Sequence, residues 1–511
     1  MSTSRSTDVA ALIPVETLSP GELKFEHYRR RVGLVLAPAV FITLLVVPMP
    51  TLSGPAHRLA AILAAVVVLW ISEVLPMPVT ALLGAVAAVV MNVAPAKEVL
   101  APFADPLIFL FIGAFILARA VFLQGLDRRF AYAVLSLPWV GTRPSRILFA
   151  FGAVTAMMSA WISNTATTAM MFGIGMSILA FFFERKEGAP AIDPRYATGL
   201  MLMTTFAASI GGLATPVGTP PNVIGLGFIR SLVGVEITFF RWMTIGVPIV
   251  ALLFAVMFGY LNALCPAGVR ELEVSRAMIT RRRAELGRWT TGQRSVAIAF
   301  GFTVLLWIVP GIIAVVLGER SPSYVTISRS IPEGIAALAG AVLLFILPGD
   351  DGERAITWTE ASRIDWGVVL LYGGGFALGV LSFQTGLAEA IGRGLTGTLP
   401  VSGEFGLLVA SVIIAVIVSE TTSNTASANM VVPVVISIAG ASGIDPLVPA
   451  LGATFASSLG FMLPVSTPCN AIVYGSGYVP LSRMIRYGAL LDVAGIIVVI
   501  AVVSLLAPLL R

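Results

Sequence analysis

Two stretches decide the fold of this sequence: W-I-S-N-T-A-T-T-A-M-M at 161–171 and E-T-T-S-N-T-A-S-A-N-M at 420–430. Both carry a Ser-Asn-Thr triplet deep within apolar sequence. Hydrocarbon offers no hydrogen-bond partners, so amides and hydroxyls at membrane depth must line a binding site or a cavity. The two triplets therefore indicate one binding site that is built from two halves of a duplicated membrane transporter.

A helix-breaking segment follows each triplet, T-P-P-N at 219–222 and T-P-C-N at 467–470. Proline lacks a backbone N–H and interrupts the helical hydrogen-bond ladder, which leaves nearby carbonyl oxygens unpaired. Unpaired carbonyl oxygens at membrane depth can coordinate a cation. Both segments are therefore predicted to break a membrane-spanning helix.

The composition is that of a polytopic membrane protein, since 57% of the 511 residues are hydrophobic and only 12% are charged. A segment of about 20 apolar residues spans a bilayer. We predict an all-α protein of about 11 transmembrane helices, two of which, near 198–230 and 446–478, are broken by the Thr-Pro-x-Asn segments. Uninterrupted spans are predicted near 32–50, 59–75, 78–93, 106–124, 242–262, 296–317, 332–348, 366–387 and 487–508.

The triplets themselves lie in apolar segments at 146–183 and 405–440, each too long for one span. Each segment is predicted to form a helix, a turn and a second helix, with the triplet at the turn. Such a unit is either a re-entrant hairpin that returns to its own side of the membrane or a pair of thin spans. Hydropathy does not separate these alternatives.

Lysine and arginine are distributed unevenly over the predicted loops. With a cytoplasmic N-terminus and re-entrant hairpins, the inner segments carry 23 of the 32 Lys and Arg residues, and the outer segments carry 8. Positive charge accumulates in cytoplasmic loops. The bias therefore favours re-entry, and it explains the net charge of +5 without a nucleic-acid site. The most basic stretch, 270–294, fits an amphipathic helix that binds anionic membrane lipids, with docking of a protein partner as the alternative.

Catalytic chemistry has no support in the sequence. The two histidines, His27 and His57, lie far from the triplets, and the two cysteines, Cys265 and Cys469, offer no disulfide framework. No cluster of His, Cys or carboxylate residues has metal-ligand spacing, and Cys469 has no evident base. We therefore expect neither an enzyme nor an organic cofactor.

Charged residues at membrane depth are few: Arg119, Glu420 and Asp492. Such residues are functional candidates by default. Neither Arg119 nor Glu420 recurs in the other half of the chain, where Val380 and Ala160 take their places. A structural or gating role is therefore favoured over proton coupling.

Four sequence blocks recur in the same order in the two halves of the chain. Gly84 and Gly340 lie 256 positions apart, Asn164 and Asn424 of the triplets lie 260 apart, and the Thr-Pro-x-Asn segments lie 248 apart. Nearly constant offsets indicate an internal repeat. The loop assignment makes the two copies inverted, with the hairpin tips meeting near the membrane midplane.

The Ser-Asn-Thr triplet supplies two hydroxyls and one carboxamide but no charge. At a hairpin tip, the unpaired N–H groups of the second helix face the tip and favour an anionic ligand. The carbonyl end of the first helix, together with Ser and Thr oxygens, suits a small cation such as Na⁺. One loop can therefore bind a carboxylate on one side and a cation on the other.

From about residue 50 to its end, the chain resembles the divalent anion:sodium symporter family, the INDY-type dicarboxylate transporters. The resemblance rests on the motifs S-A-W-I-S-N-T-A-T, G-T-P-P-N, S-E-T-T-S-N-T-A-S and S-T-P-C-N-A-I-V-Y-G-S-G. It implies a homodimer in which a scaffold carries a transport unit that moves as an elevator. It also implies a dicarboxylate or another divalent anion as substrate and Na⁺ as coupling ion.

Carried onto this chain, the resemblance implies two sodium sites and one substrate site. The sodium ligands would be Ser159, Ser163, Asn164 and the backbone of Gly218 in the first half, and Ser419, Ser423, Asn424 and the backbone near Thr467 in the second. The substrate carboxylates would contact Asn164, Thr165, Thr219, Asn424, Thr425 and Thr467. The chain departs from the family pattern at Ser419, Ser466 and Cys469, and the last two lie beside the expected substrate.

The same resemblance divides the chain into six parts: a cytoplasmic tail at 1–31, scaffold helices at 32–145, a transport unit at 146–263, a cytoplasmic basic loop at 264–295, scaffold helices at 296–403 and a transport unit at 404–511. The expected function is Na⁺-coupled uptake of C4-type dicarboxylates such as succinate, malate and fumarate across a bacterial inner membrane. Sodium-independent dicarboxylate exchange and transport of sulfate or tricarboxylates are the alternatives.

Overall fold

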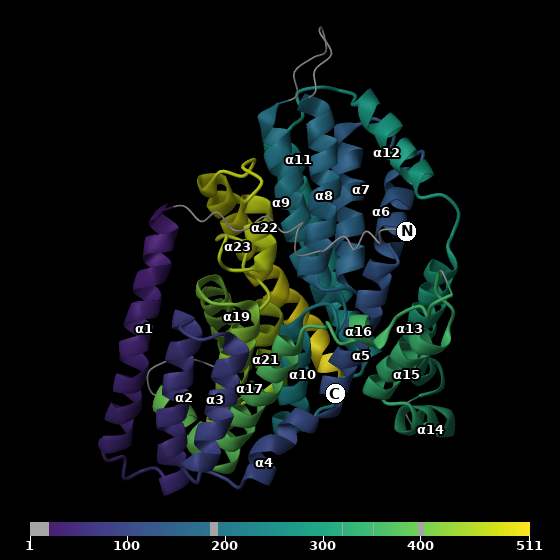
Figure 1. Cartoon of the computed structure of the whole chain (residues 1–511). Coiled ribbons are helices and arrows are strands. Elements are labelled where there is room, and N and C mark those ends of the chain that lie inside the picture. Colours follow the sequence, from purple (N-terminus) through teal and green to yellow (C-terminus); the bar gives the residue numbers. More distant parts are fainter. Residues whose placement is uncertain (1–19, 184–192, 319, 351, 397–402, 511) are drawn as a thin grey trace.

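The computed structural model describes residues 20–183, 193–318, 320–350, 352–396 and 403–510. Within these ranges the chain is helical, and β geometry is confined to one isolated bridge between Pro348 and Arg354. Figure 1 shows α1 at one edge of the molecule and α13, α14 and α15 at the opposite edge. The predicted all-α fold is confirmed.

Long apolar helices dominate the structure. In the described part of the chain, nine helices are long and apolar enough to cross a membrane, and the pair α14 and α15, bent by 59°, forms a tenth candidate.

Every uninterrupted span predicted from the sequence coincides with a helix, although this set of helices differs from the one just counted by length and hydropathy. These helices are α1 (Pro20–Val46), α2 (Gly54–Ser72), α3 (Met77–Val90), α5 (Pro106–Leu123), α11 (Phe239–Leu264), α13 (Thr291–Leu317), α15 (Glu333–Ile346), α17 (Trp366–Gln384) and α23 (Leu481–Leu506).

Helix α1 begins at Pro20, inside the segment 1–31 that was predicted to be a polar tail. The helix therefore continues the predicted span near 32–50 toward the N-terminus, into the polar segment. Hydropathy locates the apolar part of a helix, whereas a helix continues through polar residues that have good helix propensity. An ion pair anchors this polar part, since Arg29 lies 2.9 Å from Glu73 at the end of α2 and 3.5 Å from Glu26.

Each triplet lies at the turn between two helices, as predicted. The first pair is α7 (Pro144–Ser159) and α8 (Asn164–Phe183), and the second is α19 (Gly403–Thr421) and α20 (Asn424–Ala441). Helices α19 and α20 are each long and apolar enough to cross a membrane. Helix length therefore keeps the pair of spans as an alternative to the re-entrant hairpin.

The two predicted helix breaks are present. Helix α9 (Pro194–Gly211) continues in a short 3₁₀ turn to Ala214, and α10 (Pro220–Phe228) begins after an irregular segment. In the second half, α21 (Leu447–Ala456) is separated from α22 (Pro468–Tyr474). Thr219 and Thr467 precede α10 and α22 in an extended conformation, and proline at the first helical position fits the start of a helix.

Short helices connect these elements: α4 (Ala96–Leu100), α6 (Leu126–Leu135), α12 (Glu273–Glu285), α14 (Pro322–Ser330), α16 (Trp358–Ala361) and α18 (Leu387–Thr396). Helix α12 confirms a helix within the basic stretch 270–294. Its Ile279 is buried, and Arg283 donates to the hydroxyl of Ser136, just after α6, at 2.7 Å. One face of α12 therefore docks on the protein's own α6, and lipid contact through its other side chains stays a prediction.

Glycines allow a reciprocal contact between the two halves of the chain. A Cβ atom added to Gly113 of α5 would lie 2.6 Å from the Cβ of Ala337 in α15, and one added to Gly374 of α17 would lie 2.7 Å from that of Ala81 in α3. Gly113 and Gly374 occupy equivalent places in the repeat, as do Ala81 and Ala337. Each half therefore packs one helix tightly against the other half, where only glycine leaves enough room.

We expect Gly113→Ala to lower the thermal stability of the detergent-solubilised protein, because the new methyl group overlaps the backbone of Ala337. Overpacking of this kind costs about 1–3 kcal/mol. The matched control is Gly173→Ala in α8, where an added Cβ meets no atom within 4 Å. Equal melting temperatures for the two variants in a size-exclusion thermostability assay would show that the α5–α15 contact is looser than described.

Candidate functional site

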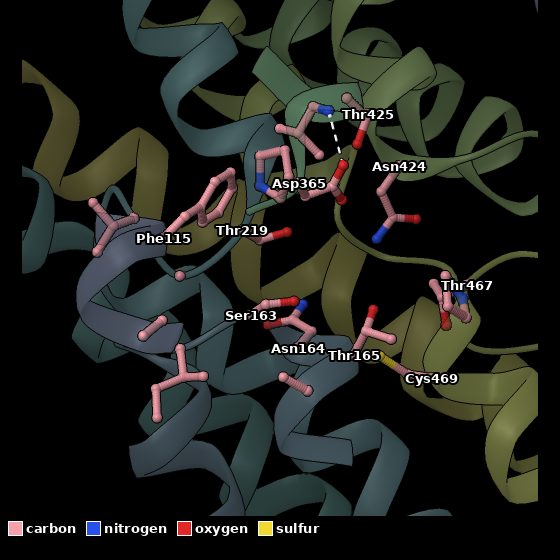
Figure 2. Close-up of a pocket in the computed structure, with 18 of the residues that line it drawn as sticks. Phe115, Ser163, Asn164, Thr165, Thr219, Asp365, Asn424, Thr425, Thr467 and Cys469 are labelled. Atoms are coloured by element: carbon pink, nitrogen blue, oxygen red, sulfur yellow. Dashed lines mark hydrogen bonds between the residues drawn. The ribbon is translucent and has the colours of Figure 1, made fainter. Parts of the chain in front are cut away.

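Both Ser-Asn-Thr triplets border one cavity of about 380 Å³ (Figure 2). The N-terminal ends of α8 and α20 reach it from the two halves of the chain, together with the starts of α10 and α22. The six residues predicted to contact the substrate all line it: Asn164, Thr165, Thr219, Asn424, Thr425 and Thr467. Folding thus brings together motifs that are separated by about half the length of the sequence.

The predicted first sodium site is a cluster of polar atoms around the carboxamide of Asn164. In one orientation, the amide nitrogen of Asn164 donates to the Ser159 hydroxyl at 2.7 Å and to the carbonyl oxygens of Ala208 and Gly218 at 3.2 Å. In the other orientation, the amide oxygen accepts from Ser159 and faces the two carbonyl oxygens. In either orientation the cluster brings several oxygen atoms together, as a sodium site requires, and Na⁺ binding here stays a prediction.

The second half repeats this arrangement. Ser419 Oγ lies 2.9 Å from Asn424 Oδ1 and 2.8 Å from the carbonyl oxygen of Ser457, and Asn424 Nδ2 donates to the carbonyl oxygen of Ser458 at 3.3 Å. Ser419, like Ser159 in the first half, precedes its asparagine by five positions and is fully buried. Each serine therefore orients the asparagine that faces the cavity.

Two predicted sodium ligands, Ser163 and Ser423, lie at the cavity wall. Ser423 caps α20, because its hydroxyl accepts a hydrogen bond from the backbone N–H of Ala426 at 3.2 Å. Gly218, the backbone ligand of the first half, also lines the cavity. A Cβ atom at Gly218 would overlap the backbone of Gly212, so this close approach of two chain segments requires glycine.

Each helix break is folded around the asparagine of its Thr-Pro-x-Asn segment. Asn222 and Asn470 are fully buried, and the amide nitrogen of each donates to two carbonyl oxygens that lie ten and seven positions earlier. The acceptors are Gly212 (2.9 Å) and Thr215 (2.8 Å) for Asn222, and Gly460 (3.1 Å) and Leu463 (2.9 Å) for Asn470. The sequence analysis missed this role, although the recurrence of asparagine in both segments was a usable signal.

Asn222→Ala and Asn470→Ala are expected to destabilise the protein, because each leaves two buried carbonyl oxygens without a donor. An unsatisfied buried polar group costs about 1–3 kcal/mol. The control is Asn262→Ala, at an exposed position of α11. Thermal unfolding of the three variants in detergent checks this prediction, and a melting temperature of Asn222→Ala equal to that of Asn262→Ala contradicts it.

The motif residues at the cavity are uncharged. Among the described residues that line it, the charged ones are Arg119 of α5 and Arg363 and Asp365, which immediately precede α17. Figure 2 shows Asp365 facing the same space as Thr219 and Thr425. The sequence analysis singled out Arg119 but missed Arg363 and Asp365, because both lie outside the repeated motifs.

Glu420 joins the second hairpin to the second helix break. Its carboxylate accepts hydrogen bonds from the backbone N–H of Met462 at 2.8 Å and from the hydroxyl of Ser466 at 2.7 Å. Asp492 of α23 lies beside it, and both acidic side chains are buried. These hydrogen bonds fit the structural or gating role that the sequence analysis favoured for Glu420, and they give the hydroxyl at position 466 a partner.

Cys469 lines the cavity next to Thr165 (Figure 2), and it is almost completely buried. It belongs to the second half of the chain, whereas Thr165 belongs to the first. The thiol therefore lies where the two half-sites meet.

The family of the chain follows from comparison with known proteins. Residues 29–510 match the family described as the sodium:sulfate symporter transmembrane region. The chain belongs to this family. The resemblance inferred from the motifs is thereby confirmed, and membership puts the chain among multi-pass membrane transporters and not among enzymes.

Two relatives have the same name, sodium-dependent dicarboxylate transporter SdcS. The protein from Staphylococcus saprophyticus is 34% identical over 494 residues, which cover 95% of this chain and 93% of the relative. The protein from Staphylococcus aureus strain USA300 is 31% identical over 487 residues, which cover 93% of this chain and 91% of the relative.

A solved structure shares the fold. The chain aligns with the Alcanivorax borkumensis YdaH transporter, whose crystal structure is described as revealing an unusual topology, with a TM-score of 0.50. The alignment covers 95% of this chain and 98% of that chain. Because the sequence identity is 13%, the likeness concerns the fold alone.

Proposed function

We propose that this protein imports C4-type dicarboxylates, such as succinate, malate and fumarate, together with Na⁺. The observation that carries the proposal is the meeting of two uncharged, oxygen-rich Ser-Asn-Thr triplets at one cavity. The names of the SdcS relatives support both the ion and the substrate class.

The charge of the substrate explains why transport depends on a cation. A dianion in a cavity whose motifs carry no charge needs countercharge, because burying an unpaired charge is costly. Sodium ions at the two Ser-Asn clusters supply this countercharge. The ligands are Ser159, Ser163, Asn164 and the backbone of Gly218 in the first cluster, and Ser419, Ser423, Asn424 and the backbone near Thr467 in the second.

Sodium also prepares the substrate site in this proposal. A bound Na⁺ fixes the amide oxygens of Asn164 and Asn424 toward the cation, so the amide N–H groups are free to donate to a carboxylate. Thr165, Thr425 and the N-terminal ends of α8 and α20 add further donors. Without the cations, the same oxygens repel the anion.

Transport proceeds by an elevator movement in the proposed cycle. The transport unit at 146–263 and 404–511 carries both half-sites, and the scaffold at 32–145 and 296–403 carries Arg119, Arg363 and Asp365. The cavity opens beside these three residues, near segments that the positive-inside bias assigns to the cytoplasm. In this proposal the protein is a homodimer in a bacterial inner membrane with its N-terminus in the cytoplasm, and the conformation described corresponds to an inward-facing state.

Sulfate or a tricarboxylate is the second candidate substrate, because the family description names sulfate and because Ser466 and Cys469 depart from the family pattern beside the cavity. Uptake of radiolabelled succinate into liposomes that contain purified protein, under imposed Na⁺, K⁺ or H⁺ gradients and with competing anions, tests these possibilities together. Succinate uptake that needs Na⁺ and is not inhibited by sulfate supports the proposal. Uptake that is indifferent to Na⁺ contradicts it in favour of exchange.

Asn164→Ala and Asn424→Ala are each expected to abolish succinate uptake, since each removes a carboxamide that has no replacement in a site shielded from water. Both variants should keep the size-exclusion profile of the wild type. The control is Asn262→Ala on the exposed face of α11, which should transport normally. Wild-type uptake by both site variants would refute the assignment of the site.

Ser163→Ala and Ser423→Ala are expected to raise the Na⁺ concentration for half-maximal uptake more than they change the maximal rate. Each substitution removes one oxygen from a proposed cation site. Uptake measured over a range of Na⁺ concentrations at saturating succinate checks this. A change in the maximal rate alone would mean that the serines support the helix starts and do not bind the ion.

A further inference from the structure

Two of the three charged residues that line the cavity, Arg119 and Arg363, are joined by the carboxylate of Glu360. Glu360 of α16 bridges two arginines, because its Oε2 lies 2.7 Å from Arg119 Nη2 and its Oε1 lies 3.1 Å from Arg363 Nη1. Both arginines line the cavity that contains the triplets. A carboxylate is therefore already held between two guanidinium groups next to the site proposed for a dicarboxylate.

This group lies at the boundary between protein and solvent. The side chain of Arg119 is 22% exposed, that of Glu360 is 28% exposed and that of Arg363 is 59% exposed. The Nε of Arg119 is buried and has no acceptor among the described residues. Arg363 reaches into water, and each guanidinium group has more N–H donors than the contacts with Glu360 use.

The chemistry of the ion pairs allows one carboxylate to replace another. A carboxylate that replaces Glu360 makes the same charge-assisted hydrogen bonds with the two guanidinium groups, so the exchange leaves neither arginine without an anionic partner. Two guanidinium groups on one carboxylate also fit the planar geometry that arginine recognises well. A mobile anion of the same chemistry can therefore take the place of Glu360.

We propose that Arg119 and Arg363 form a transient binding site for one carboxylate of the transported dianion, where the substrate displaces Glu360 as it passes between the cavity and the solvent. The inference rests on the proposed function. It adds a site on the scaffold, outside the motifs, that contacts the substrate before or after the Ser-Asn-Thr triplets do. The internal repeat provides no equivalent arginine in the second half of the chain, where Val380 occupies the position that corresponds to Arg119.

The test uses full-length protein in liposomes, with the KM for succinate measured at low and high choline chloride. Arg119→Gln and Arg363→Gln are expected to raise KM by roughly three- to tenfold, the range for loss of one partly shielded charge contact. They should also weaken the salt dependence of uptake, because fewer charges attract the anion. The Na⁺ concentration for half-maximal uptake should stay unchanged.

Glu360→Gln distinguishes substrate binding from a structural role, since the two roles predict opposite signs. If the arginines bind the substrate, removal of the competing carboxylate lowers KM. If the ion pairs only stabilise the fold, Glu360→Gln impairs uptake as the arginine variants do. The matched control is Arg393→Gln, because Arg393 pairs with Glu389 on α18, away from the cavity.

Three outcomes overturn the inference: an unchanged KM in both arginine variants, a raised KM in Glu360→Gln, or an equal effect of Arg393→Gln. If Arg119→Gln does not give a monodisperse protein, the more exposed Arg363→Gln still decides. Absence of Na⁺-dependent succinate uptake in the wild type is a separate result, which contradicts the proposed function itself.

Discussion

The site depends on how the two helix breaks satisfy their backbone. A broken helix inside a membrane protein leaves carbonyl oxygens without their usual donors, and hydrocarbon supplies none. Asn222 and Asn470 each donate to two of these oxygens and thereby fix the path of the break. Carbonyl oxygens such as that of Gly218 remain directed toward the Asn164 carboxamide. In the proposed function, this oxygen atom takes part in binding Na⁺.

The repeat gives the site two similar halves and holds them together. Ser159 and Asn164 in one half have the same relation as Ser419 and Asn424 in the other. The reciprocal glycine contacts, in which α5 packs on α15 and α17 packs on α3, interlock the two halves of the chain. A duplicated sequence thus forms one cavity, because neither half encloses the space between the triplets alone.

The charged residues that line the cavity lie outside the Ser-Asn-Thr and Thr-Pro-x-Asn motifs. The triplets offer hydroxyls and amides, whereas Arg119 lies on α5 and Arg363 and Asp365 lie just before α17. A fixed charge among the motifs would have to be neutralised in every state of the carrier, and that requirement would oppose release of either ion or substrate. Neutral motifs let charge enter and leave with the transported ions. In the proposed cycle, the arginines at the mouth act only while the cavity faces them.

The sequence by itself determined the helical membrane fold, the positions of the spans and the helix breaks. These features follow from composition, local hydropathy and recurring motifs, which act over a few turns of helix. The six residues expected to contact the substrate came from the family resemblance, and the structure places all of them at the cavity. Hydropathy did not show that the first helix begins at Pro20, because the helix continues through polar residues, which an ion pair between Arg29 and Glu73 at the end of α2 anchors. Only the tertiary structure decided that Arg363 and Asp365 line the same cavity as the triplets and that Glu420 accepts a hydrogen bond from Ser466. It also decided that Asn222 and Asn470 donate to the free carbonyl oxygens of the helix breaks. Each of these contacts joins segments that approach one another through packing, and no periodicity in the chain encodes which side chains then meet.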